Sequence, residues 1–442
     1  MLGGLWRFPR LSRAEFAARR DARLRRLVAH AYARVPYYRE LFDRHGLRPA
    51  DIRGVADLPR IPVTTKGDLL AHAPEALLAR GAHGPFVVMR TSGSTGERCT
   101  VRRTLGEQVA LHAARLRAYR AYGVRVRDHV ARIGVPRRGG LLARRVLGRP
   151  LADLAPNRQT VVDAFLPPEA IAERLAALRP DVVGGLAGVL ARVAEAALAA
   201  GDTAIRPRLV LAGSEVLTAA MRRTIETAFA APVRNVYGST ECNLLAWECP
   251  TGGLLHTCDD AAVVEVVHEG LPVAPGARGE VVVTNLHAVA MPLLRYRQGD
   301  VATRAAAGAA GACACGLPFD AIADLQGRMI DYFPLPDGRL VHPYEIVARF
   351  RDAAPWIRQY QLVQERLDRV ELRAVPVGPA AGADPAARER EVAAAIGALL
   401  GPAVDVRVTV VPEIPLEPSG KLRVARSLVH SAYDAVEWSG AA

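Results

Sequence analysis

The sequence predicts an α/β protein: a large N-terminal layered α/β domain with an additional antiparallel, barrel-like β region, and a small α+β domain at the C-terminus. Three observations support this fold class. The chain has 442 residues, which is long for a single hydrophobic core. Between residues 160 and 300, short β-rich segments alternate with helical patterns, as in layered α/β domains. After residue 327 the pattern becomes that of a second unit of ordinary domain size.

The large domain is expected to begin with helices and continue as alternating strands and helices. Residues 13–45 have an amphipathic helical pattern that is interrupted at Pro36, because proline cannot continue a helix without breaking its hydrogen bonds. Residues 208–213 have the pattern of a buried strand. A helix at 219–230 and a further strand at 233–237 follow.

Later segments predict an antiparallel region and the small domain. Residues 263–267 and 279–284 are expected to be strands of the antiparallel region. In the small domain we expect helices at 344–352 and 386–400 and an alternating strand at 404–411.

The net charge of +13 raises the question of nucleic-acid binding. The positive charge is nearly all arginine, since Lys66 and Lys421 are the only lysines, and it is spread along the chain. No basic stripe interleaved with aromatic residues is present. We therefore expect no nucleic-acid partner, although a basic surface would attract anionic ligands.

Membrane insertion is not expected either. No apolar run reaches the roughly 18 to 20 residues that span a bilayer. The most apolar segment, 182–201, contains Arg192 and Glu195. The first twenty residues lack the apolar stretch of a secretory signal, so we expect a cytoplasmic protein.

A loop of small residues is the strongest local signal. Thr91, Ser92, Gly93, Ser94, Thr95 and Gly96 follow an apolar strand at 85–89. Glycines allow tight bends that point backbone N–H groups at a ligand, and hydroxyls add further donors, so the segment predicts a phosphate-binding loop. Taken alone, it could also be a flexible surface loop.

A second segment combines an aromatic ring, a hydroxyl and a carboxylate after a predicted strand. In the run Tyr237, Gly238, Ser239, Thr240, Glu241, the ring could stack on a purine and Thr240 could bind a phosphate. Glu241 could hold Mg²⁺, which prefers oxygen ligands. The alternative is an ordinary strand end with a glycine turn.

Two further residues lie on glycine turns. Asp300 follows Gly299 and could accept hydrogen bonds from both ribose hydroxyls; Lys421 follows Gly420 and could stabilise charge that develops at an α-phosphate. In isolation, both could be solvated turn residues.

Taken in order, these segments, together with Gly327-Arg328, resemble the adenylate-forming superfamily of acyl-CoA synthetases, adenylation domains and luciferases. The resemblance covers nearly the whole chain. Segments 32–39, 57–59 and 64–66 are similar to the N-terminal signature of the phenylacetate–CoA ligase branch, and the total length is short for the wider superfamily.

The resemblance implies an enzyme that uses ATP and Mg²⁺ to convert a small carboxylic acid to acyl-AMP and then transfers the acyl group to coenzyme A. It also implies an adenylation core at 1–326, a hinge at 327–331 and a mobile C-terminal domain at 332–442 that carries Lys421. The implied roles are phosphate binding by Thr91, Ser92, Gly93, Ser94, Thr95 and Gly96; lining of the adenine pocket by Gly213, Ser214 and Glu215; stacking near adenine by Tyr237, beside Gly238 and Ser239; contact with the α-phosphate by Thr240; Mg²⁺ binding by Glu241; ribose binding by Asp300 with Arg328; and bridging of carboxylate and α-phosphate by Lys421.

Two departures from the family pattern leave alternatives open. Glu97-Arg98 stands where the family often has a lysine after the loop, and Ile330, with Asp331 next, stands where a hinge carboxylate is usual. The acceptor could instead be a separate carrier-protein thiol, an amine or a hydroxyl, and a non-catalytic relative is conceivable. Members of this branch often form homodimers, but the sequence itself leaves the oligomeric state open.

Four residues predict a structural zinc site. Cys249 and His256 lie in a segment rich in glycine and proline, and Cys313 and Cys315 follow later in the chain. If the fold brings these pairs together, they form a tetrahedral Cys₃His set; close relatives are similar at both segments. Cys258 is a competing ligand, and the alternative is a group of reduced, partly buried cysteines.

Overall fold

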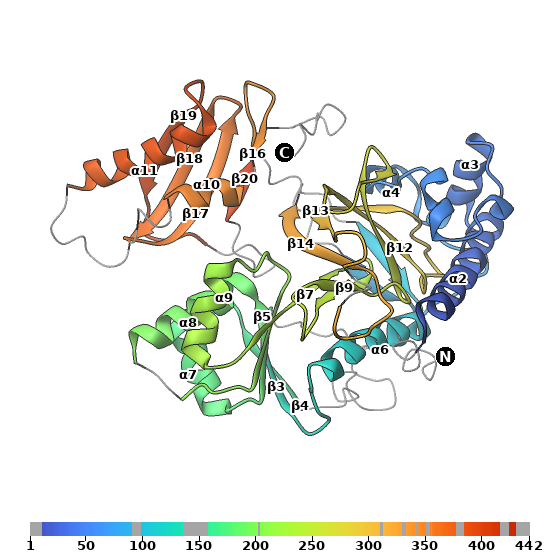
Figure 1. The fold of residues 1–442 in the computed structure, drawn as a ribbon, viewed down its shortest axis with the longest axis horizontal. Coiled ribbons are helices and arrows are strands. Elements are labelled where there is room, and N and C mark those ends of the chain that lie inside the picture. Colours follow the sequence, from blue (N-terminus) through green and yellow to red (C-terminus); the bar gives the residue numbers. More distant parts are fainter. Residues whose placement is uncertain are drawn as a thin grey trace. The chain divides into compact units, whose positions relative to one another are not determined.

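The computed structural model describes residues 11–90, 99–135, 158–201, 204–309, 313–328, 333–341, 343–350, 354, 356–376, 384–415 and 424–429. The chain divides into two compact units, residues 1–326 and 327–442 (Figure 1).

A twelve-stranded sheet forms the centre of the first unit. The strands that pair in parallel are β3 (His129–Gly134), β4 (Arg158–Asp163), β5 (Val182–Leu186), β6 (Leu209–Gly213) and β7 (Val233–Ser239). The remaining strands are β8 (Asn243–Glu248), β9 (Leu255–Thr257), β10 (Ala262–His268), β11 (Leu271–Pro272), β12 (Arg278–Asn285), β13 (Tyr296–Arg304) and β14 (Ala321–Arg328). Their order is β11-β10-β12-β13-β14-β9-β8-β7-β6-β5-β3-β4, and β8 pairs antiparallel with β7. The predicted fold class is confirmed, and the antiparallel region continues the parallel strands within one sheet.

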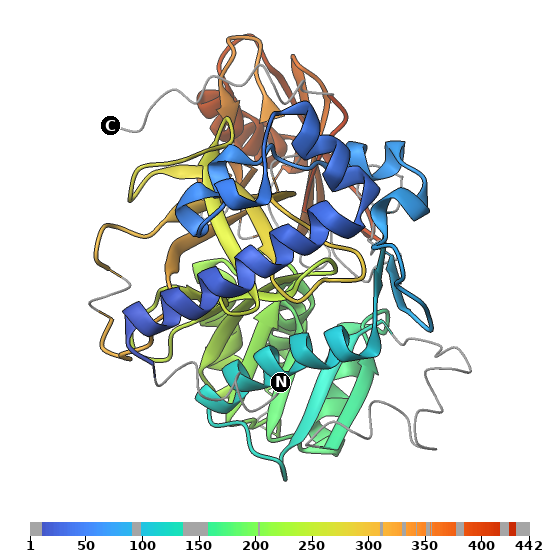
Figure 2. The same ribbon diagram turned by 90° about the vertical axis from the view of Figure 1, so that its right-hand side faces the viewer.

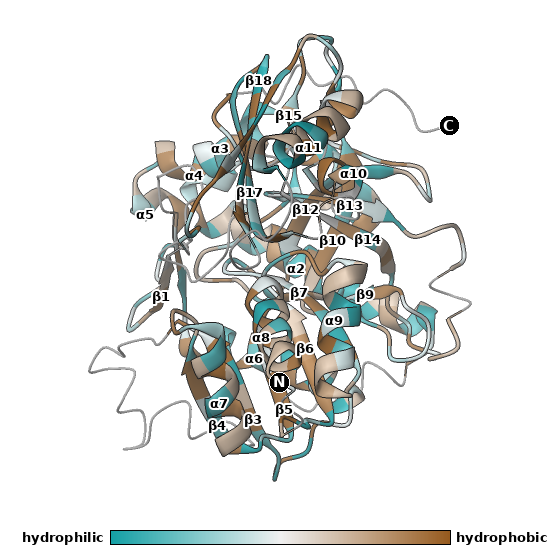
Figure 3. Cartoon of the chain, turned by 90° about the vertical axis from the view of Figure 1, so that its left-hand side faces the viewer, coloured by the Kyte–Doolittle hydropathy of each residue, from teal (hydrophilic) through white to brown (hydrophobic). Residues whose placement is uncertain are grey.

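Helices cover both faces of the parallel strands. Figure 3 shows α7 (Pro168–Leu178), α8 (Ala187–Ala199) and α9 (Ala219–Phe229) in front of them, and Figure 2, from the opposite side, shows α6 (Leu105–Ala121). Figure 2 also shows α2 (Arg13–Arg34), which packs on the antiparallel strands β10 and β12. Neighbouring residues along a strand face opposite layers. Val183 and Val210 pack in the core with α7 to α9, whereas Val182 and Leu209 lie in a cluster with Tyr119 of α6. This double burial explains the predicted buried strand at 208–213.

The N-terminal helices form as expected around Pro36. Ser12 and Glu15 form a capping box at the start of α2, and Pro36 occupies the first turn of α3 (Pro36–Arg44), where its missing N–H costs no helical hydrogen bond. Leu24 and Val28 of α2 are fully buried in a core shared with β10 and β12.

The segment after these helices is tied to the start of β13. It contains η2 (Pro49–Asp51), η3 (Val55–Arg60), α4 (Lys66–Ala71) and α5 (Pro74–Leu77). Buried Thr64 forms a bridge with Tyr296, and the Arg295 guanidinium donates to the Ile61 carbonyl across 2.7 Å and pairs with Glu265 at 3.1 Å. The segments similar to the family's N-terminal signature therefore pack directly beside the strand that carries Asp300.

The second unit is an α+β structure with its own core. Its four-stranded sheet contains β17 (Ile357–Arg366), β18 (Arg369–Pro376), β19 (Asp405–Val410) and β20 (Ala425–Ser427), in the order β19-β18-β17-β20. A short pair, β15 (Phe333–Pro334) with β16 (Leu340–Val341), and the helices α10 (Pro343–Phe350) and α11 (Pro385–Leu400) complete it. Among the described residues of either unit, no helix is long and apolar enough to cross a bilayer.

Candidate active site

Two of the predicted motifs lie side by side at one edge of the sheet. β6 ends at Gly213 and β7 ends at Ser239, and these neighbouring strands are parallel, with Gly213 paired to Val236. Ser214 and Glu215 therefore follow β6 at the same edge at which Thr240 and Glu241 follow β7. Ligands of open α/β sheets bind at the carboxyl ends of such strands.

A hydrogen bond joins the predicted adenine and ribose residues. The Tyr237 hydroxyl donates to Asp300 Oδ2 across 2.6 Å. Tyr237 belongs to β7 and is 6% exposed, while Asp300 lies in β13. The structure thus brings together two residues that the sequence placed only in separate segments, Tyr237 at a strand end and Asp300 after a glycine turn.

Glu241 is held from both its side chain and its backbone. Its Oε1 accepts from the Tyr296 hydroxyl at 3.4 Å, and its carbonyl accepts from Asn285 Nδ2 at 3.1 Å. Burial raises the pKa of Tyr296, so this phenol stays protonated and acts as a donor at neutral pH. Burial also raises the pKa of the neighbouring Cys242 to about 12, so its thiol stays neutral.

Close backbone contacts explain the glycines of these motifs. A Cβ on Gly238 would lie 2.1 Å from the Asn243 carbonyl oxygen, and a Cβ on Gly213 would lie 2.5 Å from the Val236 oxygen. The pairing of β7 with β8 also shifts register between Tyr237 and Gly238. Only glycine fits at either position without moving the backbone.

Glu215 binds the start of a neighbouring helix. Its Oε2 accepts from the Gly188 N–H in the first turn of α8 at 2.7 Å, and α8 has no side-chain cap of its own. A carboxylate is favourable there because the first N–H groups of a helix lack partners within it. Glu215 therefore fixes the loop after β6 against the start of α8, which follows β5 directly.

Two parts of the predicted site, the segment Thr91 to Gly96 and Lys421, lie outside the described residues. The strands on either side of the loop form an antiparallel pair, β1 (Val87–Arg90) with β2 (Thr100–Arg103). Arg328 is the last residue of β14, and the structure describes the backbone of this residue.

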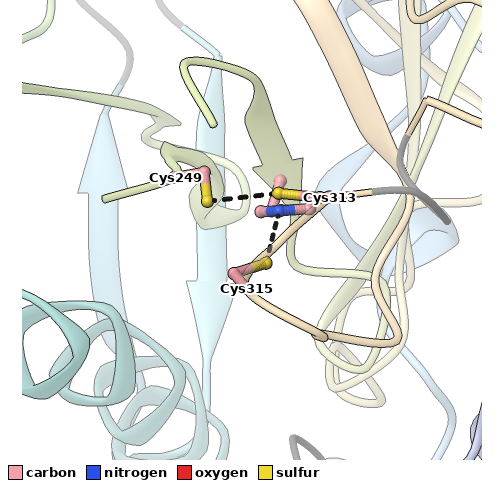
Figure 4. A group of neighbouring side chains, drawn as sticks. Cys249, Cys313 and Cys315 are labelled. Atoms are coloured by element: carbon pink, nitrogen blue, oxygen red, sulfur yellow. Dashed lines mark hydrogen bonds between the residues drawn. The ribbon is translucent and has the colours of Figure 1, made fainter. Parts of the chain in front are cut away.

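The four predicted zinc ligands form one cluster, and Figure 4 labels its three cysteines. Their ligand atoms all lie within 4.8 Å of one another. Cys249 Sγ lies 3.4 Å from Cys313 Sγ, and Cys315 Sγ lies 3.2 Å from His256 Nε2. These separations approach the edges of about 3.8 Å expected for a tetrahedron with zinc–sulfur bonds of about 2.3 Å.

The surroundings of the cluster also fit a metal. His256 Nδ1 lies 3.3 Å from the Asp320 carbonyl, a contact that directs Nε2 toward the sulfurs. A Cβ on Gly252 would meet Cys313 Sγ at 2.8 Å, so glycine lets the two turns approach. Cys258, the competing candidate, is fully buried next to Arg117 and does not belong to the cluster.

Known proteins resemble this chain over most of its length. No family model matches it. Phenylacetate-coenzyme A ligase of Thermus thermophilus is 29% identical over 381 residues, covering 82% of each chain. The Escherichia coli enzyme of the same name is 30% identical over 304 residues, covering 65% of this chain and 67% of the relative. The chain belongs to the phenylacetate–coenzyme A ligase family.

The fold of this chain is also similar to that of a solved ligase structure. A 2-hydroxyisobutyryl-CoA ligase, in the postadenylation state with an acyl-AMP, superimposes with a TM-score of 0.78 at 21% identity, covering 96% of this chain and 91% of the other. At this identity the likeness supports the fold alone. The predicted resemblance to the phenylacetate–CoA ligase branch is confirmed by the relatives of that name.

The sequence patterns did not point to two residues of the candidate active site. Tyr296 lies four residues before Asp300 and was given no role, and its hydroxyl contacts Glu241. Arg103 was not considered, and it contacts the Thr240 carbonyl. The one signal that could have pointed to it is an arginine in a short strand directly after the predicted phosphate-binding loop.

Proposed function

We propose that this chain joins a small carboxylic acid to AMP, with release of pyrophosphate, and then transfers the acyl group to coenzyme A. The observation that carries the proposal is the contact between Tyr237 and Asp300 beside the Thr240–Glu241 turn, in a chain of this family. These groups offer a ring for a base, a carboxylate for a ribose and a hydroxyl for a phosphate.

In the first step, a carboxylate oxygen of the acid attacks the α-phosphorus of ATP, and the bond to the β-phosphate breaks. Tyr237 and Asp300 orient the nucleoside, and Thr240 positions the α-phosphate. Lys421 offsets the negative charge between the two reactants. Most of the rate enhancement in such a reaction comes from orientation and charge stabilisation.

In the second step, the coenzyme A thiol attacks the acyl carbonyl, and the bond to AMP breaks. We assign the adenylation core to residues 1–326, a hinge to 327–331 and a mobile domain to 332–442. Reorientation about this hinge would exchange the surface that faces the adenylate. The curated relatives are named as coenzyme A ligases, which favours this thiol over a carrier protein.

Two metals fit residues of the core. Glu241 offers the oxygen ligand that Mg²⁺ prefers, and the ion would offset charge on the phosphates. Cys249, His256, Cys313 and Cys315 would hold a structural Zn²⁺ that closes the turn after β8 against the segment before β14. The zinc set takes no part in either chemical step.

Acid-dependent exchange of radiolabelled pyrophosphate into ATP tests the first step, across a panel of aryl, acyl and hydroxy acids. We expect exchange with at least one acid and a fall of about hundredfold or more in Lys421→Ala. The matched control is Arg366→Ala, which removes an exposed cation of the same unit that pairs with Asp368. Wild-type protein that exchanges with no acid would refute the function.

Comparison of acceptors tests the second step. The adenylate formed from the active acid is offered coenzyme A or a phosphopantetheinyl carrier protein, and thioester is measured. We expect rapid thioester formation with coenzyme A. Transfer to the carrier protein alone would overturn the acceptor and leave the adenylation step standing.

A further inference from the structure

A buried arginine joins three parts of the core next to the Thr240–Glu241 turn. Arg103, the last residue of β2, is 1% exposed. Its Nη2 donates to the Thr240 carbonyl at 2.5 Å. Its Nη1 lies 3.2 Å from Gln108 Oε1 on α6 and 3.3 Å from Met89 Sδ on β1.

These partners do not neutralise the charge of Arg103. They are a carbonyl, an amide oxygen and a thioether, and Arg103 Nε is buried without a hydrogen-bond partner among the described residues. The acids that act on it electrostatically include Glu241 and Glu107. The Glu107 carboxylate already accepts the N–H groups of Val289 at 2.5 Å and Ala290 at 2.7 Å. A buried cation with such neutral contacts is costly, and groups of this kind concentrate at functional sites.

The contact with Thr240 fixes more than one atom. The peptide that joins Thr240 to Glu241 is planar, so holding its oxygen fixes the N–H and both Cα atoms. The next peptide is held in the same way, because Asn285 Nδ2 donates to the Glu241 carbonyl. Side chains from two distant segments therefore set the direction of both residues of the turn.

We propose that Arg103 is a positioning residue for adenylation, which holds the Thr240–Glu241 turn in the geometry that binds the α-phosphate and its magnesium ion. This inference rests on the proposed function. Arg103 reaches its acceptors in different directions through the rigid fork of the guanidinium. A lysine ammonium cannot reproduce that fork, so Arg103→Lys removes the geometry and keeps the charge.

Kinetics of the pyrophosphate exchange test the proposal in Arg103→Lys. We expect the KM for MgATP to rise about tenfold, which is the effect expected when one hydrogen bond from a charged group is lost. The Mg²⁺ concentration that gives half-maximal exchange should also rise. The KM for the acid should stay within about twofold. Thioester formation from supplied acyl-AMP, which needs no triphosphate, should change less.

Arg117→Lys is the matched control, because Arg117 is another buried arginine of this unit and is paired with Asp260 instead. It should lower the melting temperature and leave the KM for MgATP unchanged. If Arg103→Lys does not fold, Gln108→Leu decides, since it removes one acceptor from a half-buried position, and a rise of about threefold in the same KM is expected.

Unchanged MgATP and Mg²⁺ dependence in the folded variant would overturn the positioning role. Equal rises in the KM for MgATP and for the acid would also overturn it, because they indicate a general structural defect. Wild-type protein without any exchange would refute the proposed function and this inference with it.

Discussion

The Tyr237 hydroxyl donates to the Asp300 carboxylate across 2.6 Å, although 63 residues separate them in sequence. β7 and β13 are four positions apart in the sheet order. In a flat sheet, strands four positions apart would lie about 19 Å from each other, too far for these side chains to meet. The antiparallel strands must therefore curl toward β7, which is the curvature of the predicted barrel-like region.

Tyr237→Phe keeps the ring and removes the hydroxyl that orients Asp300. We expect the KM for ATP in pyrophosphate exchange to rise about tenfold while kcat changes little. The reason is that Asp300, the proposed ribose ligand, loses the hydrogen bond from Tyr237 that orients its carboxylate. The control is Tyr32→Phe, which removes the hydroxyl of a half-buried phenol that donates to Asp43 at 2.9 Å. Equal KM values in both variants and the wild type would contradict a role for this contact.

Gly238→Ala should disrupt the turn that carries Thr240 and Glu241. The added Cβ would meet the Asn243 oxygen at 2.1 Å, and backbone must move to relieve the overlap. We expect a loss of roughly 2–4 kcal/mol in the free energy of unfolding and a severe loss of exchange activity. Gly106→Ala is the control, because no atom lies within 4 Å of its Cβ position; chemical denaturation of both variants should separate them.

Local patterns predicted most elements because each depends on neighbours in sequence. The break at Pro36, the buried strand at 208–213 and the helix at 386–400 follow from hydrogen-bonding and burial periodicity, and the structure has them as α2 with α3, β6 and α11. The order of the motifs along the chain pointed to Tyr237 and Asp300 as candidate site residues.

Contacts between distant segments were not predictable from those patterns. The bond between Tyr237 and Asp300 depends on how the sheet curls, and the burial of Arg103 depends on α6 and the turn after β7 packing around it. The cysteine pairs suggested metal ligands, but only the fold places Cys249 beside Cys313. Such placement depends on tertiary packing, which short sequence patterns do not encode.

Elemental analysis should find about one zinc per purified chain, because the clustered thiols and imidazole match a Cys₃His set. We expect the double variant Cys313→Ser/Cys315→Ser to lose the metal. It should also melt at a lower temperature, since metal binding to the folded state contributes to stability.

Cys99→Ser is the control for this experiment, because Cys99 is buried and lies outside the cluster. Its metal content should equal that of the wild type. A wild-type chain purified without chelators that contains no zinc, or a double variant that keeps it, would contradict the assignment.

His287 should make the core sensitive to acid. Burial, with the nearby Arg23 charge, lowers the pKa of His287 to about 4, and Arg23 Nη1 lies 3.0 Å from His287 Nε2. The native state thus binds fewer protons than the unfolded state between about pH 4 and the ordinary pKa of about 6.5. The stability of the wild type relative to His287→Gln should therefore fall as the pH decreases through this range, by on the order of 2–3 kcal/mol. Urea unfolding of both proteins at pH 7.5 and 4.5 measures the difference, and parallel pH profiles would show that His287 is not buried in its neutral form.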